Sequence, residues 1–323
     1  MLAVLMPGRG RRSRRLAPSL EGLEGLPWPV ADSLLKSLDA VSVLRLGSTS
    51  RAFSRQISQA WNLNSLLSRF VRHVSAFRRK LATVGAVIGG GLPTQFFARE
   101  YWPASDVDIF IGDHVWHERS LRSGLNRYPY RLFGRRLAVL RSFLVDHEGY
   151  EPYEPSEPYG HRSPSFLSLR KSNKVVQIIG VNCSGVSLSP EIGVIEVLIR
   201  RFYGTHVMNF ITADMALSLF PRTTFERREM FLVRDGMDRT GDPTLDSELS
   251  AVAKYRSRGW RVSSFAGDEL SSLRSLFDAK CWVMHFGRDG SVVARSGKPS
   301  CDVRFALGED GVVRLRDLNV DRS

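Results

Sequence analysis

The spacing of apolar residues along the chain changes character near residue 84. Before this point, apolar residues recur at the intervals that one face of a helix requires. Asp39 and Ser42 offer a break and an N-cap between two short helices, and a further helix is expected from Leu63 toward Phe77. The first part of the chain is therefore predicted to be a compact helical unit.

Beyond residue 84, short apolar runs alternate with turn residues, which is typical of strands and helices around a mixed sheet. The elements predicted here are a strand at 84–88, a helix at 92–101, a strand at 107–111, a hairpin at 166–181 and helical segments at 191–202 and 212–219. After residue 236 the chain is more polar. The elements predicted there are a helix near 268–276 and strands at 281–286, 291–295 and 312–315.

These patterns predict an α+β protein, in which an N-terminal helical unit precedes a mixed sheet with flanking helices. A length of 323 residues suffices for one large or two moderate domains. The predicted divisions are a basic tail at 1–22, a helical segment at 23–75, an α/β core at 80–235 and a C-terminal α+β extension at 236–323.

The charge is strongly positive, with a formal net charge of +13. Five arginines and no acidic residue lie in the first 20 positions. Such a field favours encounter with nucleic acid, anionic membranes or acidic proteins without selecting one of them. Five later arginines either form an ordinary solvated face or, if they line the cleft, hold phosphates; they are Arg200, Arg201, Arg222, Arg227 and Arg228.

Apolar runs and cysteine spacing give limited information about the cell compartment and about metal sites. No apolar run reaches the roughly 18 residues of a membrane-spanning helix. The three cysteines form no CxxC pair, which argues against a zinc ribbon and a disulfide framework. A cytoplasmic or nuclear location is expected and no secretory signal, although the arginine-rich start also resembles a mitochondrial presequence.

Two acidic residues and two glycines carry the candidate chemistry. Asp106 and Asp108 are spaced so that, on a strand, both carboxylates point to one face, which suits a divalent cation such as Mg²⁺. Gly90 and Gly91 end a predicted strand and begin a helix, where bare N–H groups suit a phosphate. The alternative is a tight turn beside a solvated acidic edge.

The segments Val87–Phe97 and Ser105–Phe110 resemble the core motif of the nucleotidyltransferase (DNA polymerase β-like) superfamily, a small-residue pair followed by an acid–apolar–acid strand. The resemblance implies that Asp106 and Asp108 ligate Mg²⁺, and that Gly90, Gly91 and Ser105 contact a nucleoside triphosphate. Four later segments resemble a broad group of fungal proteins with this core; they are Val176–Ile179, Thr205–Ile211, Ala216–Arg222 and Lys254–Trp260.

One position departs from the superfamily pattern. Active members place a third carboxylate on a later core strand, and the residue in the matching place here is Gln177. An amide brings no negative charge and cannot act as a base. Substitutes from elsewhere in the sequence would be Glu191, Glu196 or Asp214, although nothing in the sequence places them at the site.

The N-terminal helical segment resembles an F-box, the motif that docks on a Skp-type adaptor of a cullin ubiquitin ligase. The matching residues are Leu26, Pro27, Val30, Leu34, Leu35 and Leu38, followed by Val43–Leu46 and Ser50–Phe53. The resemblance implies that these residues form an exposed apolar ridge covered by a partner helix. The alternative is that they pack on the domain that follows.

Two functions remain open at this point. The first is an F-box-like adaptor with a degenerate nucleotidyltransferase-like domain, and the second is an active Mg²⁺-dependent transferase of NMP from an NTP to an acceptor. His206 and Asn209 are either site residues or a buried polar pair. The phenylalanines Phe202, Phe210, Phe220 and Phe225 are expected to be core residues rather than a stacking platform.

Overall fold

The computed structural model describes residues 26–47, 49, 57, 60–103, 105–113, 130–154, 166–183, 189–233, 244–263, 273–293, 303–307 and 313–316. The predicted basic tail lies outside these residues. The helices are α2 (Trp28–Lys36), α3 (Ala40–Gly47), α5 (Leu63–Leu67), α6 (Val74–Val84), α7 (Gly91–Ala98), α9 (Tyr130–Ser142), α10 (Pro190–Arg201) and α11 (Thr244–Ser257). The shorter turns are the π-helical η1 (Phe143–His147) and η3 (Arg222–Glu226) and the 3-10 helix η2 (Thr205–Val207).

The strands assemble into one large mixed sheet with the order β12-β11-β7-β6-β1-β2-β5-β4-β3. Its members are β1 (Ala86–Gly89), β2 (Val107–Asp113), β3 (Glu151–Pro152), β4 (Phe166–Lys171), β5 (Lys174–Asn182), β6 (Asn209–Ile211), β7 (Met215–Ser218), β11 (Trp282–Phe286) and β12 (Val292–Val293). The neighbours β2 and β5 run parallel, and the other neighbouring pairs run antiparallel. The expected α+β class with a large mixed sheet is confirmed.

Smaller strand groups lie outside this sheet. They are the pair β8 (Glu229–Phe231) and β9 (Arg261–Ser263), and the trio β10 (Arg274–Ser275), β13 (Arg304–Leu307) and β14 (Val313–Arg316). Strands β11 and β12 come from the segment predicted as a C-terminal extension. The large sheet therefore joins this segment to the α/β core.

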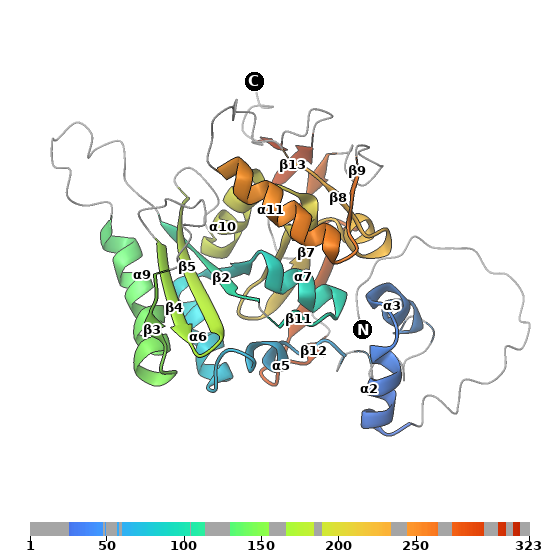
Figure 1. The fold of residues 1–323 in the computed structure, drawn as a ribbon, viewed down its shortest axis with the longest axis horizontal. Helices are drawn as coiled ribbons and strands as arrows, with labels where there is room; N and C mark the ends of the chain where they lie inside the picture. Colours follow the sequence, from blue (N-terminus) through green and yellow to red (C-terminus); the bar gives the residue numbers. More distant parts are fainter. Residues whose placement is uncertain are drawn as a thin grey trace, which may run out of the picture.

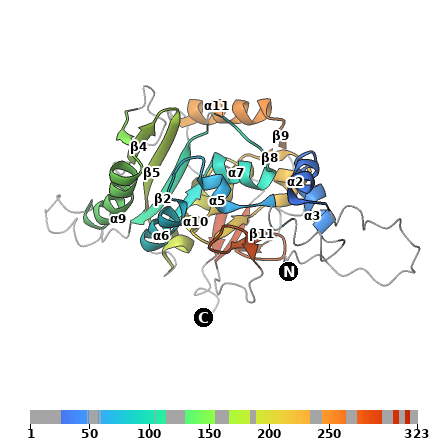
Figure 2. The same ribbon diagram turned by 90° about the horizontal axis from the view of Figure 1, so that it is seen from below.

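Helices cover both faces of the sheet (Figures 1 and 2). One apolar cluster contains Phe77 of α6, Leu140 of α9 and Ile109 of β2. A second cluster contains Val194 of α10 and Phe110 of β2, together with Phe210 and Phe220. Since alternate residues of a strand face opposite sides, Asp108 lies on the same face as Phe110. The expected core roles of Phe210, Phe220 and Phe225 are confirmed by their burial, and Phe202 packs partly buried against the same core.

The helical unit at the N-terminus begins as predicted. The Asp39 carboxylate accepts a hydrogen bond from the Ser42 backbone N–H at 2.8 Å, so α2 and α3 are separated by the expected cap. The single helix predicted from Leu63 toward Phe77 is wrong. The chain forms α5 and then α6, because the backbone N–H groups of Arg72 and His73 donate to the Glu148 carboxylate instead of continuing a helix.

Three further predictions need correction. The helical segment predicted at 212–219 is the strand β7, which pairs with β6 through a turn in which the Thr212 N–H donates to the Met215 carbonyl at 2.8 Å. Both faces of β7 are buried, so its continuous apolar run carries no period that separates strand from helix. Residues 274–275, predicted within a helix, form β10. Helices α9 and α11 were not expected.

Candidate functional site

The glycine pair and the acidic pair meet where β1 and β2 lie side by side. Gly89 of β1 is in register with Asp108 of β2, and Asp108 is in register with Gln177 of β5. Ser168 of β4 is in register with Gln177 in turn. Because residues in register on neighbouring strands share a face of the sheet, these four positions form one row across it. Asp106 immediately precedes β2.

Two features of the structure require a glycine at position 90. Its φ of 70° is the left-handed region that favours glycine, and a Cβ there would stand 2.5 Å from Oδ2 of Asp108. The carboxylate therefore packs directly against the backbone that leads into α7. The arrangement that the sequence predicted, with the glycine pair beside the acidic pair, is present in the fold.

Asp108 is held in an environment that disfavours its charge. Burial raises the pKa of Asp108 well above 3.8, and the neighbouring Asp106 raises it further, while Lys254 of α11 acts in the opposite direction. No donor among the described residues hydrogen-bonds the Asp108 carboxylate. A carboxylate in this setting gains from a proton or from an added cation.

No described residue brings a third acidic ligand to this pair. Gln177 occupies the place on β5 beside Asp108, and it is buried. Of the residues considered as substitutes, Glu191 lies beside Ser189, Glu196 lies 3.7 Å from Arg200, and Asp214 sits in the exposed turn between β6 and β7. The described residues contain no group of three or more His, Cys, Asp or Glu side chains that could hold a metal ion. Their donor set therefore does not fit a two-metal centre.

Helix α11 closes over the glycine pair and was missed by the sequence reasoning. The Tyr255 hydroxyl lies 3.5 Å from the point where a Cβ on Gly91 would stand. Tyr255 is buried, and burial raises its pKa well above 10. Figure 1 shows α11 running across the front of the molecule near α7. The N–H groups at the start of α7 are thus approached by a side chain of the protein itself.

A buried polar cluster lies beneath Tyr255. The His206 ring meets the Tyr255 ring at a centroid distance of 4.2 Å, and the Asn209 amide donates to Thr94 Oγ1 at 3.1 Å and to the His206 carbonyl at 2.8 Å. Burial lowers the pKa of His206 to about 3, so the ring is neutral at pH 7. Both His206 and Asn209 are fully buried, which agrees with the alternative of a polar pair in the core.

Ser105 has a positioning role in the structure. Its hydroxyl accepts a hydrogen bond from Nε2 of the buried Gln95 at 2.6 Å. The Gln95 Oε1 atom accepts from the Trp102 backbone N–H at 2.9 Å and from Arg69 at 3.3 Å. One buried amide therefore fixes the connection between α7 and β2, on which Asp106 depends for its position.

The F-box-like residues divide between two faces of α2. Leu35 is buried in the core, so it is not part of an exposed surface, and Leu26 is half-buried. Pro27, Val30, Leu34 and Leu38 are exposed, the last three by 47%, 46% and 39%. Val30 and Leu34 lie four residues apart on α2 and share one side of the helix, and Leu38 follows just after the helix ends at Lys36. We call these three residues the α2 ridge. Residues 48 and 50–56 of the F-box-like segment lie outside the described residues.

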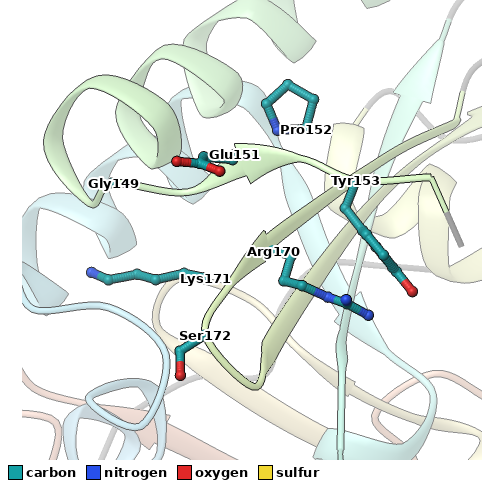
Figure 3. A pocket seen from close by; sticks show the side chains of 7 residues that line it. All are labelled: Gly149, Glu151, Pro152, Tyr153, Arg170, Lys171 and Ser172. Carbon is teal, nitrogen blue, oxygen red and sulfur yellow. The ribbon is translucent and has the colours of Figure 1, made fainter.

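A separate hollow lies at the β3 edge of the sheet (Figure 3). It has a volume of about 310 Å³ and is lined by Gly149, Glu151, Pro152, Tyr153, Arg170, Lys171 and Ser172. The Arg170 guanidinium stands 3.4 Å from the centre of the Tyr153 ring, and Lys171 donates to the Glu148 carbonyl. The strands β5 and β4 separate this hollow from Asp108 on β2.

Comparisons with known proteins add no family to this picture. No protein family matches the chain, and no curated protein matches it significantly. Within the described part of the chain, no helix is long and apolar enough to cross a membrane. Inferences about function therefore rest on the residues and their geometry.

Proposed function

We propose that the protein is an F-box-like adaptor whose nucleotidyltransferase-like domain has lost its catalytic role. The observation that carries the proposal is the α2 ridge, in which Val30 and Leu34 are exposed on a helix anchored by the buried Leu35, and Leu38 is exposed just beyond the end of that helix. Soluble proteins rarely expose contiguous apolar surface without a partner. An apolar groove between helices of a Skp-type adaptor is the partner that the F-box resemblance implies.

The acidic site supports the degenerate assignment. Gln177 stands in register with Asp108, where the third carboxylate of an active transferase is expected. Tyr255 lies against Gly91, at the place where a phosphate would need the backbone N–H groups. The positive charge of Lys254 acts on Asp108 from within the chain. Each of these features reduces the need or the room for Mg²⁺ and a triphosphate.

Binding to a purified Skp-type adaptor tests the proposal directly. Leu34→Asp should abolish co-elution of the full chain with the adaptor in size-exclusion chromatography, because it places a charge in the centre of an apolar contact. Leu249→Asp is the matched control, since Leu249 of α11 is 58% exposed and lies outside the ridge. The absence of a complex with the unmodified chain, or equal loss with both variants, would contradict the proposal.

A second function is favoured by the close packing of Asp108 on Gly90. Two carboxylates beside a glycine turn can hold one divalent ion, which is part of the site that an active nucleotidyltransferase needs. Calorimetric titration with ATP, CTP, GTP and UTP, with and without Mg²⁺, separates the two functions. Binding that requires Mg²⁺ and disappears in Asp106→Ala/Asp108→Ala would favour the transferase. No binding at millimolar nucleotide would favour the adaptor.

A further inference from the structure

Three arginine side chains stack on aromatic rings around the connection between α7 and β2. The guanidinium of Arg258 stands 3.8 Å from the centre of the Trp102 ring, and that of Arg69 stands 4.4 Å from the centre of the Tyr101 ring. The Arg228 guanidinium stands 4.4 Å from the Trp260 ring. Such stacks leave the N–H edges of the guanidinium available to acceptors while the ring covers its face.

These stacks belong to one connected network. Gln95 binds both Arg69 and the Trp102 backbone, and the Trp102 and Trp260 rings meet edge to face with their centres 6.0 Å apart. Glu100 links the network again, because its carboxylate accepts from Trp102 Nε1 at 3.0 Å and from Arg228 at 2.5 Å. We call the six stacked side chains, Arg69, Tyr101, Trp102, Arg228, Arg258 and Trp260, the arginine–aromatic strip.

The strip has one exposed ring, and two of its three arginines, Arg69 and Arg258, have no carboxylate partner among the described residues. Tyr101 is 66% exposed, whereas Trp102 and Trp260 are buried. Arg228 is paired with Glu100, but no salt bridge of Arg258 to a carboxylate occurs among the residues that the structure describes. An exposed flat ring beside guanidinium groups matches a ligand that offers an unstacked base and a phosphate together.

We infer that the arginine–aromatic strip binds single-stranded nucleic acid, with a base stacked on Tyr101 and backbone phosphates at Arg69 and Arg258. A single strand fits better than a duplex, because bases inside a duplex are already stacked and cannot cover the Tyr101 ring. The overall charge of +13 favours the same class of ligand. The strip is distinct from the α2 ridge, so this function goes beyond the proposed adaptor role.

Fluorescence anisotropy of the full chain with labelled U12 RNA and dT12 DNA tests the assignment. Tyr101→Ala should weaken binding roughly 5- to 150-fold, the loss expected for one stacked base. Tyr101→Phe should keep the affinity within about twofold, because the ring remains. Tyr101 is exposed, so neither change should disturb folding. The relative affinities for U12 and dT12 show whether RNA or DNA is preferred.

Arg258→Lys separates stacking from charge. The variant retains the positive charge but loses the planar guanidinium, and we expect affinity to fall by roughly 2- to 5-fold. Tyr153→Ala is the matched control, since Tyr153 also lies beneath an arginine, Arg170, but at the β3 edge of the sheet. This variant should bind U12 like the unmodified chain.

Three outcomes would overturn the inference. They are no binding of either oligonucleotide at low salt, equal affinity for a duplex of the same length, and equal loss of affinity in Tyr101→Ala and Tyr153→Ala. The second and third would mean that the positive field alone attracts the nucleic acid. Because adaptor binding is measured at the α2 ridge, failure here leaves that proposal standing, and the reverse also holds.

Discussion

Two carboxylates of this protein, the buried Glu148 and the half-buried Asp108, are treated in opposite ways by their surroundings. Burial alone would raise the pKa of Glu148, but the backbone N–H groups of Arg72 and His73 and the His73 ring donate to its carboxylate and bring the pKa below 4.5. Burial also raises the pKa of Asp108, and there the neighbouring Asp106 adds to the effect. The Glu148 carboxylate therefore has hydrogen-bond donors, whereas no described residue donates to the Asp108 carboxylate.

The difference separates a structural acid from a site acid. Between α5 and α6, the Glu148 carboxylate accepts hydrogen bonds from two backbone N–H groups that no helix satisfies. Its negative charge therefore stabilises the fold. Asp108 packs against Gly90 with no donor among the described residues, so its charge is a cost to the folded state. An acid whose pKa is raised by its surroundings is typical of functional sites.

The largest effect is expected when the satisfied acid is removed. Glu148→Ala leaves two backbone N–H groups without their acceptor, and we expect the free energy of unfolding to fall by about 2–4 kcal/mol. Urea denaturation measures this loss. Glu151→Ala is the matched control, because Glu151 is exposed in the same region, and it should change stability by less than about 0.5 kcal/mol. Equal effects would mean that Glu148 is not a structural acid.

Removal of charge should have opposite signs at the two positions. Asp108→Asn should raise the free energy of unfolding at pH 7 by on the order of 1 kcal/mol, because it removes a partly buried charge to which no described residue donates. Glu148→Gln should lower it by about 1–2 kcal/mol, because charge-assisted hydrogen bonds are lost. Both are measured by urea denaturation of the purified chain.

A loss of stability in Asp108→Asn would break the comparison. It would show that a cation compensates the Asp108 carboxylate in the folded protein. Repeating the measurement after removal of divalent ions with EDTA would then identify the cation as a bound metal, which would favour the transferase alternative.

The sequence predicted the position of this site better than its surroundings. The register of β1, β2 and β5 follows from short apolar strands, so Gly90, Asp108 and Gln177 come together as the motif indicated. Helix α11 escaped because few of its residues are buried: Val252 and Tyr255 face inward, whereas Leu249 is exposed. Such a helix has no clear apolar stripe. Its electrostatic interaction with Asp108, through Lys254, joins residues that are distant in sequence.

The N-terminal helices show the same limit on another scale. The Asp39 cap is a local signal within four residues, and it was predicted correctly. The end of the helix predicted from Leu63 depends on Glu148, which lies 75 residues beyond His73. The strand β7 was taken for a helix because burial on both of its faces removes the alternation that marks strands. The first error arises from a partner distant in sequence, and the second from burial that exists only in the folded chain.

The pH dependence of stability should differ between the two acids. The pKa of Glu148 is lowered on folding, so its stabilising contribution is present above pH 4.5 and is lost as the pH falls through the folded value. The pKa of Asp108 is raised, so its cost is absent below pH 3.8 and appears as the pH rises toward the folded value. Both follow from the sign of the shift.

Urea denaturation between pH 7 and pH 3 tests these directions. The difference between the unmodified chain and Glu148→Gln should shrink as the pH falls below 4.5, and the difference from Asp108→Asn should shrink as it approaches 3.8. Both differences should end below about 0.5 kcal/mol. Differences that stay constant over this range would mean that packing, not ionisation, separates the variants.

The smallest effect is expected from a charge on α11 that acts on Asp108. Lys254 counteracts the rise in the pKa of Asp108. Lys254→Gln should therefore move the titration midpoint of the Asp108 carboxyl carbon, followed by NMR, to higher pH, with a loss of stability of a few tenths of a kcal/mol. Arg256→Gln is the control, because Arg256 lies on the same helix but is not among the charges that act on Asp108. If both variants shift the midpoint equally, the general field of the protein governs Asp108. If only Lys254→Gln does, α11 supplies the site with a charge that a metal ion would otherwise have to provide.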